Sequence, residues 1–91
     1  MIDLDLILKT KIYKRFGIVD WEVMSNPSVS AQSKALYAIL CVYCGDKREC
    51  FPSISTLADI LDKSQRQISR NIKELKAAGV IKRIGRKIIL C

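Results

Sequence analysis

Residues 64–78 carry a cluster of long cationic and amide side chains at the spacing of one helical face. Arg66, Arg70 and Lys73 recur at intervals of four and three residues, so a helix places them on the same side. A guanidinium can donate a fork to O6 and N7 of guanine, and a carboxamide can pair with N6 and N7 of adenine. The chemistry is therefore recognition of base edges. The candidates for base reading are Gln65, Arg66, Gln67, Arg70 and Asn71.

A second set of side chains suits contact with phosphate, which positions a protein on nucleic acid without reading sequence. Lysines continue along the same helix, and further cations follow in the next segment. Hydroxyl side chains at 53–56 stand at the start of an earlier helix, whose free N–H groups can hold a phosphate. The candidates for backbone contact are Ser53, Ser55, Thr56, Lys63, Lys73, Lys76, Arg83, Arg86 and Lys87.

Positive charge is concentrated at the end of the chain. Residues 63–91 hold nine Lys or Arg and one acid, Glu74, for a net charge of +8. Residues 1–62 hold seven bases and eight acids, for a net charge of −1, and the 91 residues together carry +7. A basic surface confined to one part of a small domain is typical of proteins with a polyanionic partner.

The four cysteines, at 41, 44, 50 and 91, do not form a convincing metal site. Structural zinc sites use four ligands at defined loop spacing, whereas two of these cysteines lie in an apolar helical run and the chain has no histidine. We expect no metal and no other cofactor, with the cysteines present as thiols that pack as small apolar residues. No nucleophile–base pair, carboxylate pair or glycine-rich phosphate loop is visible, so the sequence predicts no enzyme.

Membrane and secretory classes are also disfavoured. The longest apolar run, residues 35–44, is far shorter than the roughly 20 residues of a spanning helix. The first residues carry acids where a secretory signal would carry bases. The sequence therefore predicts a cytoplasmic protein.

The pattern along the chain predicts three helices followed by two strands. Ser30, Ser53 and Ser64 are placed to cap helices over about 30–44, 53–61 and 64–78, with Gln67 completing a capping box. Gly79 ends the third helix, and Gly85-Arg86 is a two-residue hairpin turn between strands at 80–84 and 87–90. The fold class is mainly α with a small β-hairpin, a winged helix-turn-helix.

This organisation is that of a single domain over residues 1–91. An N-terminal part, 1–29, holds an alternating strand-like segment at 2–8, a basic stretch at 9–15 and a short helix over Trp21–Met24 behind Asp20. The basic stretch is either an arm that touches DNA backbone or a solvated connector. A three-helix core occupies 30–79, and the wing hairpin occupies 80–91. The first long helix is apolar on all faces, so either the N-terminal part or a partner subunit must cover it.

Several segments together resemble a winged-helix family. They are residues 29–40 and 64–70, Cys-Phe-Pro-Ser at 50–53, Thr-Leu-Ala at 56–58, and Leu-x-x-x-Gly-x-Ile at 75–81. The chain resembles, over about residues 16–87, the N-terminal DNA-binding domain of phage and plasmid replication initiators (replisome organisers) and related regulators. Two positions depart from that pattern: Asp62 stands where a glycine often closes the second helix, and Lys63 where an apolar residue usually fills the turn.

The sequence leaves three functions open. The first is sequence-specific binding of duplex DNA, in replication initiation or transcriptional regulation, with a possible homodimer matching two half-sites. The second is a protein–protein association module of a replisome-type or primosome-type assembly, with replication proteins as partners. The third is an RNA-binding winged helix.

Overall fold

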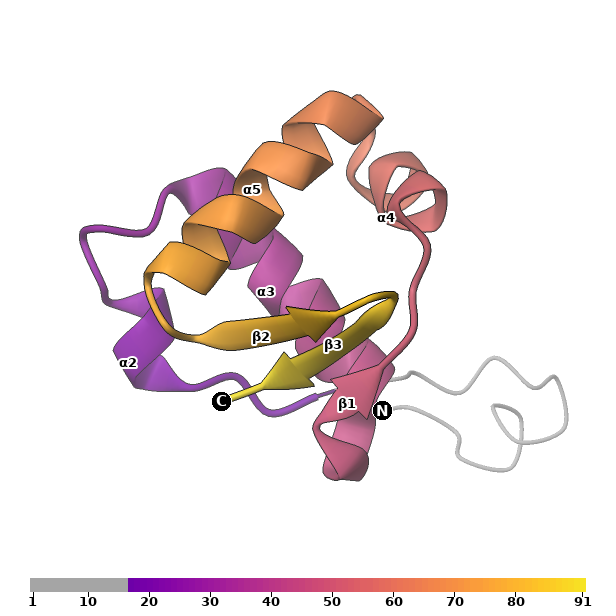
Figure 1. Ribbon diagram of the computed structural model, residues 1–91. Helices are drawn as coiled ribbons and strands as arrows, with labels where there is room; N and C mark the ends of the chain where they lie inside the picture. The colour runs from indigo at the N-terminus through magenta and orange to yellow at the C-terminus, as the bar shows by residue number, and fades with distance from the viewer. Residues whose placement is uncertain (1–16) are drawn as a thin grey trace, which may run out of the picture.

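The computed structural model describes residues 17–91. The strand-like segment expected at 2–8 and the basic stretch at 9–15 lie outside the described residues. The elements are α2 (Trp21–Met24), α3 (Ala31–Cys44), a 3₁₀ turn η1 (Gly45–Lys47), β1 (Glu49–Cys50), α4 (Ile54–Leu61), α5 (Gln65–Ala77), β2 (Ile81–Ile84) and β3 (Lys87–Leu90). The order of three helices and a hairpin confirms the predicted fold class (Figure 1).

Serine caps begin the three longer helices, as predicted. Ser30 Oγ accepts from Ser33 N at 3.2 Å, Ser53 Oγ from Thr56 N at 3.0 Å, and Ser64 Oγ from Gln67 N at 3.1 Å. Each bond satisfies one of the N–H groups that a helix start leaves unpaired. The boundaries therefore follow from short local sequence signals.

The turn between α4 and α5 depends on Asp62. Its φ of 53° lies in the left-handed region, which aspartate tolerates better than most residues. This conformation lets Lys63 N donate to Ala58 O at 3.0 Å and close the end of α4. The side chain of Lys63 is exposed, so the turn needs no apolar residue there.

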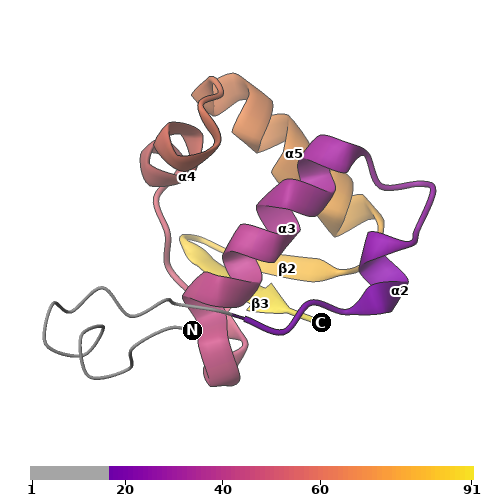
Figure 2. The same ribbon diagram turned by 180° about the vertical axis from the view of Figure 1, so that it is seen from behind.

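The hairpin belongs to a three-stranded antiparallel sheet of order β1-β3-β2. The sequence predicted two strands, and β1 is an additional one, because Glu49 and Cys50 pair with Ile89 and Ile88 of β3. Gly85, with a φ of 59°, makes the tight turn between β2 and β3. Helix α3 covers one face of the sheet, and the opposite face carries no described helix (Figures 1 and 2).

One core joins the helices to the covered face of the sheet. Buried side chains come from every layer, among them Leu36, Tyr37 and Leu40 of α3, Leu57 of α4, Ile68, Ile72 and Leu75 of α5, and Ile88 of β3. The apolar faces of α4 and α5 point into this core. In the described residues no helix is long and apolar enough to cross a membrane.

The chain before α2 covers part of α3. The sequence had left open whether the N-terminal part or a partner subunit covers this helix, and the N-terminal part does so in part. Gly17 lies so close to α3 that a Cβ there would stand 2.8 Å from the backbone of Cys41. Only glycine allows this approach. The rest of the N-terminal half leaves large apolar side chains in solvent, since Ile18 and Trp21 are 85% and 78% exposed.

Asp20 precedes α2 as predicted, but its carboxylate does not cap that helix. Instead Asp20 Oδ2 accepts from the hydroxyl of Tyr37 at 2.8 Å and lies 3.6 Å from the guanidinium of Arg48. Arg48 also donates to the carbonyl of Cys91 at 2.9 Å. Burial of Tyr37 and its bond to Asp20 raise the pKa of the phenol well above its usual range. This network ties α2, α3 and the end of the sheet together.

The cysteine expectation is wrong for two of the four residues. Cys44 and Cys50 form a disulfide that joins the end of α3 to β1. Cys41 and Cys91 are free, and burial raises the pKa of the Cys41 thiol. The pairing arises because η1 turns the chain back and brings β1 beside the end of α3, which no sequence pattern had indicated.

Candidate nucleic-acid interface

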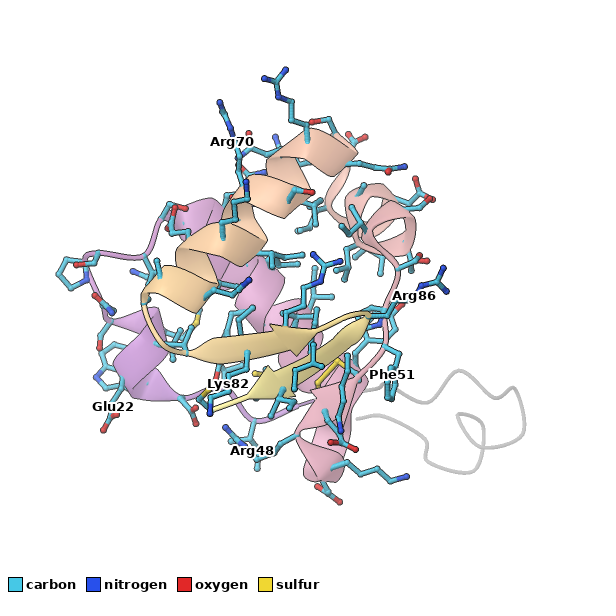
Figure 3. All side chains as sticks on the ribbon, in the orientation of Figure 1. Glu22, Arg48, Phe51, Arg70, Lys82 and Arg86 are labelled. Carbon is cyan, nitrogen blue, oxygen red and sulfur yellow. A yellow bond between two sulfur atoms is a disulfide. The ribbon has the colours of Figure 1, made fainter. Side chains whose placement is uncertain are left out.

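Helix α5 separates an apolar face from a cationic one. Ile68, Ile72 and Leu75 are at most 2% exposed and face the core. The side chains of Gln65, Arg66, Arg70, Lys73 and Lys76 are exposed. Arg70 projects away from the sheet into solvent in Figure 3. The face predicted from helical spacing is therefore present, and nothing in the described chain covers it.

Asn71 does not belong to that exposed face. Its side chain is only 2% exposed, and its Oδ1 accepts a hydrogen bond from Gln67 Nε2 at 3.2 Å. The position follows the buried stripe, because residues 68, 71, 72 and 75 have the i, i+3, i+4, i+7 spacing of one helix face. Asn71 is thus removed from the base-reading candidates.

Gln67 is half-buried, and its amide is directed to Asn71. Of the two hydrogen bonds of the predicted capping box, the one from Gln67 N to Ser64 Oγ is formed. The side chain of Gln67 instead bonds to Asn71, one turn further along α5. One N–H of Gln67 Nε2 is used within the helix, which leaves the second N–H and the carbonyl oxygen of this side chain available.

Helix α4 runs through the turn at its C-terminal end into α5 (Figure 1), and its N-terminal end carries three hydroxyl side chains. Ser53, Ser55 and Thr56 are all exposed there. The hydroxyls of Ser53 and Thr56 lie 2.8 Å apart and bond to each other, and Ser53 Oγ already takes one backbone N–H. Of the three hydroxyl side chains, Ser55 is the one with no such internal bond.

The wing carries its cations around the β2–β3 turn. Arg83 and Arg86 are exposed, and Arg83 Nε donates to Gly85 O at 3.1 Å, which holds that guanidinium at the turn. Arg86 projects outward from the turn (Figure 3). Lys87 differs, because its Nζ forms an ion pair with Glu49 Oε2 at 3.0 Å. Lys87 is thus already partnered, whereas no acid among residues 17–91 lies within ion-pair distance of Arg86.

Glu74, the single acid of residues 63–91, joins two helices. Glu74 Oε1 accepts from the backbone N–H of Ser30, at the start of α3. This bond lowers the pKa of the Glu74 carboxyl, with side-chain bonds to Ser30 and Ser33 acting the same way. The carboxylate therefore joins α5 to α3 and makes no ion pair with the cations of the exposed face in the described residues.

A family model described as a helix-turn-helix domain matches residues 29–81. The match runs from just before α3 to the first residue of β2, which is more than half of the 91 residues. The chain belongs to this helix-turn-helix family. Neither the search of curated proteins nor the search of solved structures gives a match.

Membership of the family points to DNA as the partner of the helix-turn-helix domain. Within the matched range, α4 and α5 are successive helices joined by the tight turn at Asp62. The family description names neither a biological role nor a target. Within residues 17–91 no three His, Cys, Asp or Glu side chains gather in a way that would suit a metal ion.

Three exposed side chains of the helix-turn-helix domain were missed from the sequence. Lys82 is an unpaired cation of β2 in the described structure, and Phe51 and Ile84 are each 66% exposed beside the wing turn. Alternation along β2 could have indicated Lys82 and Ile84, because they lie two residues apart on the side of the strand opposite to the buried Ile81.

Proposed function

We propose that the domain binds duplex DNA in a sequence-specific manner, with α5 in the major groove and the wing against the adjacent backbone or minor groove. The observation that carries the proposal is the exposed cationic face of α5, whose neighbouring acid is engaged elsewhere. A major groove admits one helix, and base edges are read from its N-terminal half.

The side chains divide by their position along α5. Arg66 and Arg70 lie in the first half and are exposed, so they are assigned to bases together with Gln65 and Gln67. Lys73 and Lys76 lie further along and are assigned to phosphate. Lys63, Arg83, Arg86 and the N-terminus of α4 extend the phosphate-binding surface on both sides. The resemblance to replication initiators favours a role in replication initiation or transcriptional regulation.

Specificity and affinity should separate on mutation. Arg66→Ala or Arg70→Ala should cost about 1–3 kcal/mol on a selected site and little on scrambled duplex, because a lost base contact matters only on the correct sequence. Arg86→Ala is the matched control, since it removes the same guanidinium from the wing and should weaken binding to both duplexes equally. None of these side chains contributes to the core, so all three variants should remain folded.

The measurement is the ratio of affinities for the selected and scrambled duplexes, after selection of a site from random sequence. The same titrations with single-stranded DNA and RNA test the RNA-binding alternative. If the Arg66 and Arg70 variants keep the wild-type ratio while the Arg86 variant loses it, α5 is not the reading helix and the assignment is wrong.

A second candidate function, self-association, is favoured by the exposed apolar residues near α2. Ile18 and Trp21 are the two most exposed large apolar side chains of the described chain. A homodimer through this half would present two α5 helices to two half-sites. Trp21→Ser should then abolish a dimer seen by sedimentation at tens of micromolar. A wild-type protein that sediments only as a monomer, with and without DNA, would exclude it.

A further inference from the structure

An isoleucine stands in solvent at the tip of the wing. Ile84 is the last residue of β2, directly before the Gly85-Arg86 turn, and it is 66% exposed. Its partner across the hairpin is Lys87. One exposed apolar side chain is ordinary, but several that lie together at one end of a domain can mark an interaction surface.

A second apolar side chain lies at the same end of the sheet. Cys50 of β1 pairs with Ile88 and faces the core, so the next residue, Phe51, follows on the outer side near Lys87. Phe51 is 66% exposed, and Figure 3 places it at the same end of the sheet as Arg86. The wing-tip surface consists of Phe51, Ile84 and the cations next to Ile84 in the hairpin, Arg83, Arg86 and Lys87.

The wing-tip surface combines apolar side chains with cations. Its polar members are all cations, and the nearest acid, Glu49, is neutralised by Lys87. Docking an apolar protein surface here would bury these cations without partners, at a considerable cost in desolvation. Duplex DNA instead offers phosphates to the cations and apolar base faces to Ile84. Charge complementarity therefore selects duplex DNA as the occupant.

We propose that Ile84 acts as a wedge that enters the minor groove and partly unstacks one base step, while Phe51 supports it and Arg83 and Arg86 hold the flanking phosphates. This inference rests on the proposed DNA binding by α5 and adds a deformation of the duplex to it. Isoleucine and phenylalanine are among the side chains that proteins insert between base steps in this groove. Because pyrimidine–purine steps unstack most easily, the wing should favour a TA or CA step at its position.

The test compares Ile84→Ser with Ile60→Ser, a control of the same residue type in α4 that is 50% exposed and outside the wing. Each variant is bound to a selected duplex with fluorophores at both ends and 2-aminopurine at the wing-facing step. Ile84→Ser should lower affinity about tenfold, the value expected from removing one buried isoleucine side chain. It should also straighten the duplex and quench 2-aminopurine, with no change in the salt slope. Ile60→Ser should leave all four quantities unchanged.

The outcomes are distinguishable. If Ile84→Ser keeps wild-type affinity and bend, the wedge is wrong although DNA binding stands. If it loses self-association in sedimentation and keeps DNA affinity, the surface docks a protein and the wedge is again wrong. If the wild-type protein binds no duplex at low salt, the proposed function itself fails.

Discussion

The ion pair between Lys87 and Glu49 limits how Lys87 can contact phosphate in the proposed DNA-binding surface. Arg86 and Lys87 are neighbours at the wing, yet only Lys87 has an acid, at 3.0 Å. A phosphate that contacts Lys87 must displace Glu49 or be repelled by it. We therefore predict that Arg86→Ala and Lys87→Ala, which each remove one positive charge, have different effects on the salt dependence of binding.

The magnitude follows from the exposed cations assigned to phosphate. Lys63, Lys73, Lys76, Arg83 and Arg86 make five, and each neutralised phosphate contributes about −0.9 to the slope of log K against log salt. The wild-type slope should be about −4.5, a loss of about 500-fold in affinity between 50 and 200 mM salt. Arg86→Ala should reduce this loss to about 150-fold, whereas Lys87→Ala should leave it near 500-fold.

Glu49→Gln provides the reverse test, because it frees Lys87 for phosphate without changing the size of the side chain. The loss over the same salt range should rise to about 2,000-fold, and affinity at low salt should increase. The assay is fluorescence anisotropy on a labelled duplex at five or more salt concentrations for the wild type and the three variants. Equal slopes for the Arg86 and Lys87 variants would refute the argument, and so would a wild-type slope near zero.

Three further predictions concern the fold. The bond from Ser30 N lowers the pKa of the Glu74 carboxyl in the folded protein. The stability that this bond contributes is therefore present above the unfolded-state pKa and is lost as pH falls through the folded-state pKa. The free energy of unfolding in urea at acidic pH should thus depend less on pH in Glu74→Gln than in the wild type. Replacing Cys44 and Cys50 together by alanine should lower the free energy of unfolding by about 2 kcal/mol, the loop-closure value for so short a loop. Dithiothreitol should destabilise the wild type and not this variant. Elemental analysis of protein purified without chelator should find well under one zinc per chain.

The helices were predictable because their signals are local. Serine caps, a periodic apolar stripe and a terminal glycine each act within a few residues, and the bounds of α3, α4 and α5 follow them closely. The hairpin was equally local, since Gly85 fixes the turn. Strand β1 was not predictable, because two residues carry no alternation and acquire their strand conformation only by pairing with β3, nearly forty positions later.

The exposure and pairing of the candidate side chains were harder to predict than the helices, because they depend on contacts between distant segments. Charge and helical angle were enough to place Arg66 and Arg70 in solvent. Asn71 was misassigned because its polarity was given more weight than its place in the apolar stripe, where tertiary packing buries it. The pairing of Lys87 with Glu49 depends on the register of β1 against β3, which the sequence does not reveal.

The position of the Glu74 carboxylate affects the repulsion among the cations of α5. Arg66, Arg70 and Lys73 stand four and three residues apart, and like charges at these spacings destabilise a helix by about 0.2–0.5 kcal/mol per pair. Glu74, four residues after Arg70, could relieve this repulsion, although an acid C-terminal to its base is the weaker orientation. Its carboxylate instead accepts from Ser30 N, and Arg70 makes no ion pair within the part of the chain that the structure describes. Phosphate bound at this face would reduce the repulsion among its cations, so added inorganic phosphate should raise the thermal stability of the domain more than chloride of equal ionic strength does.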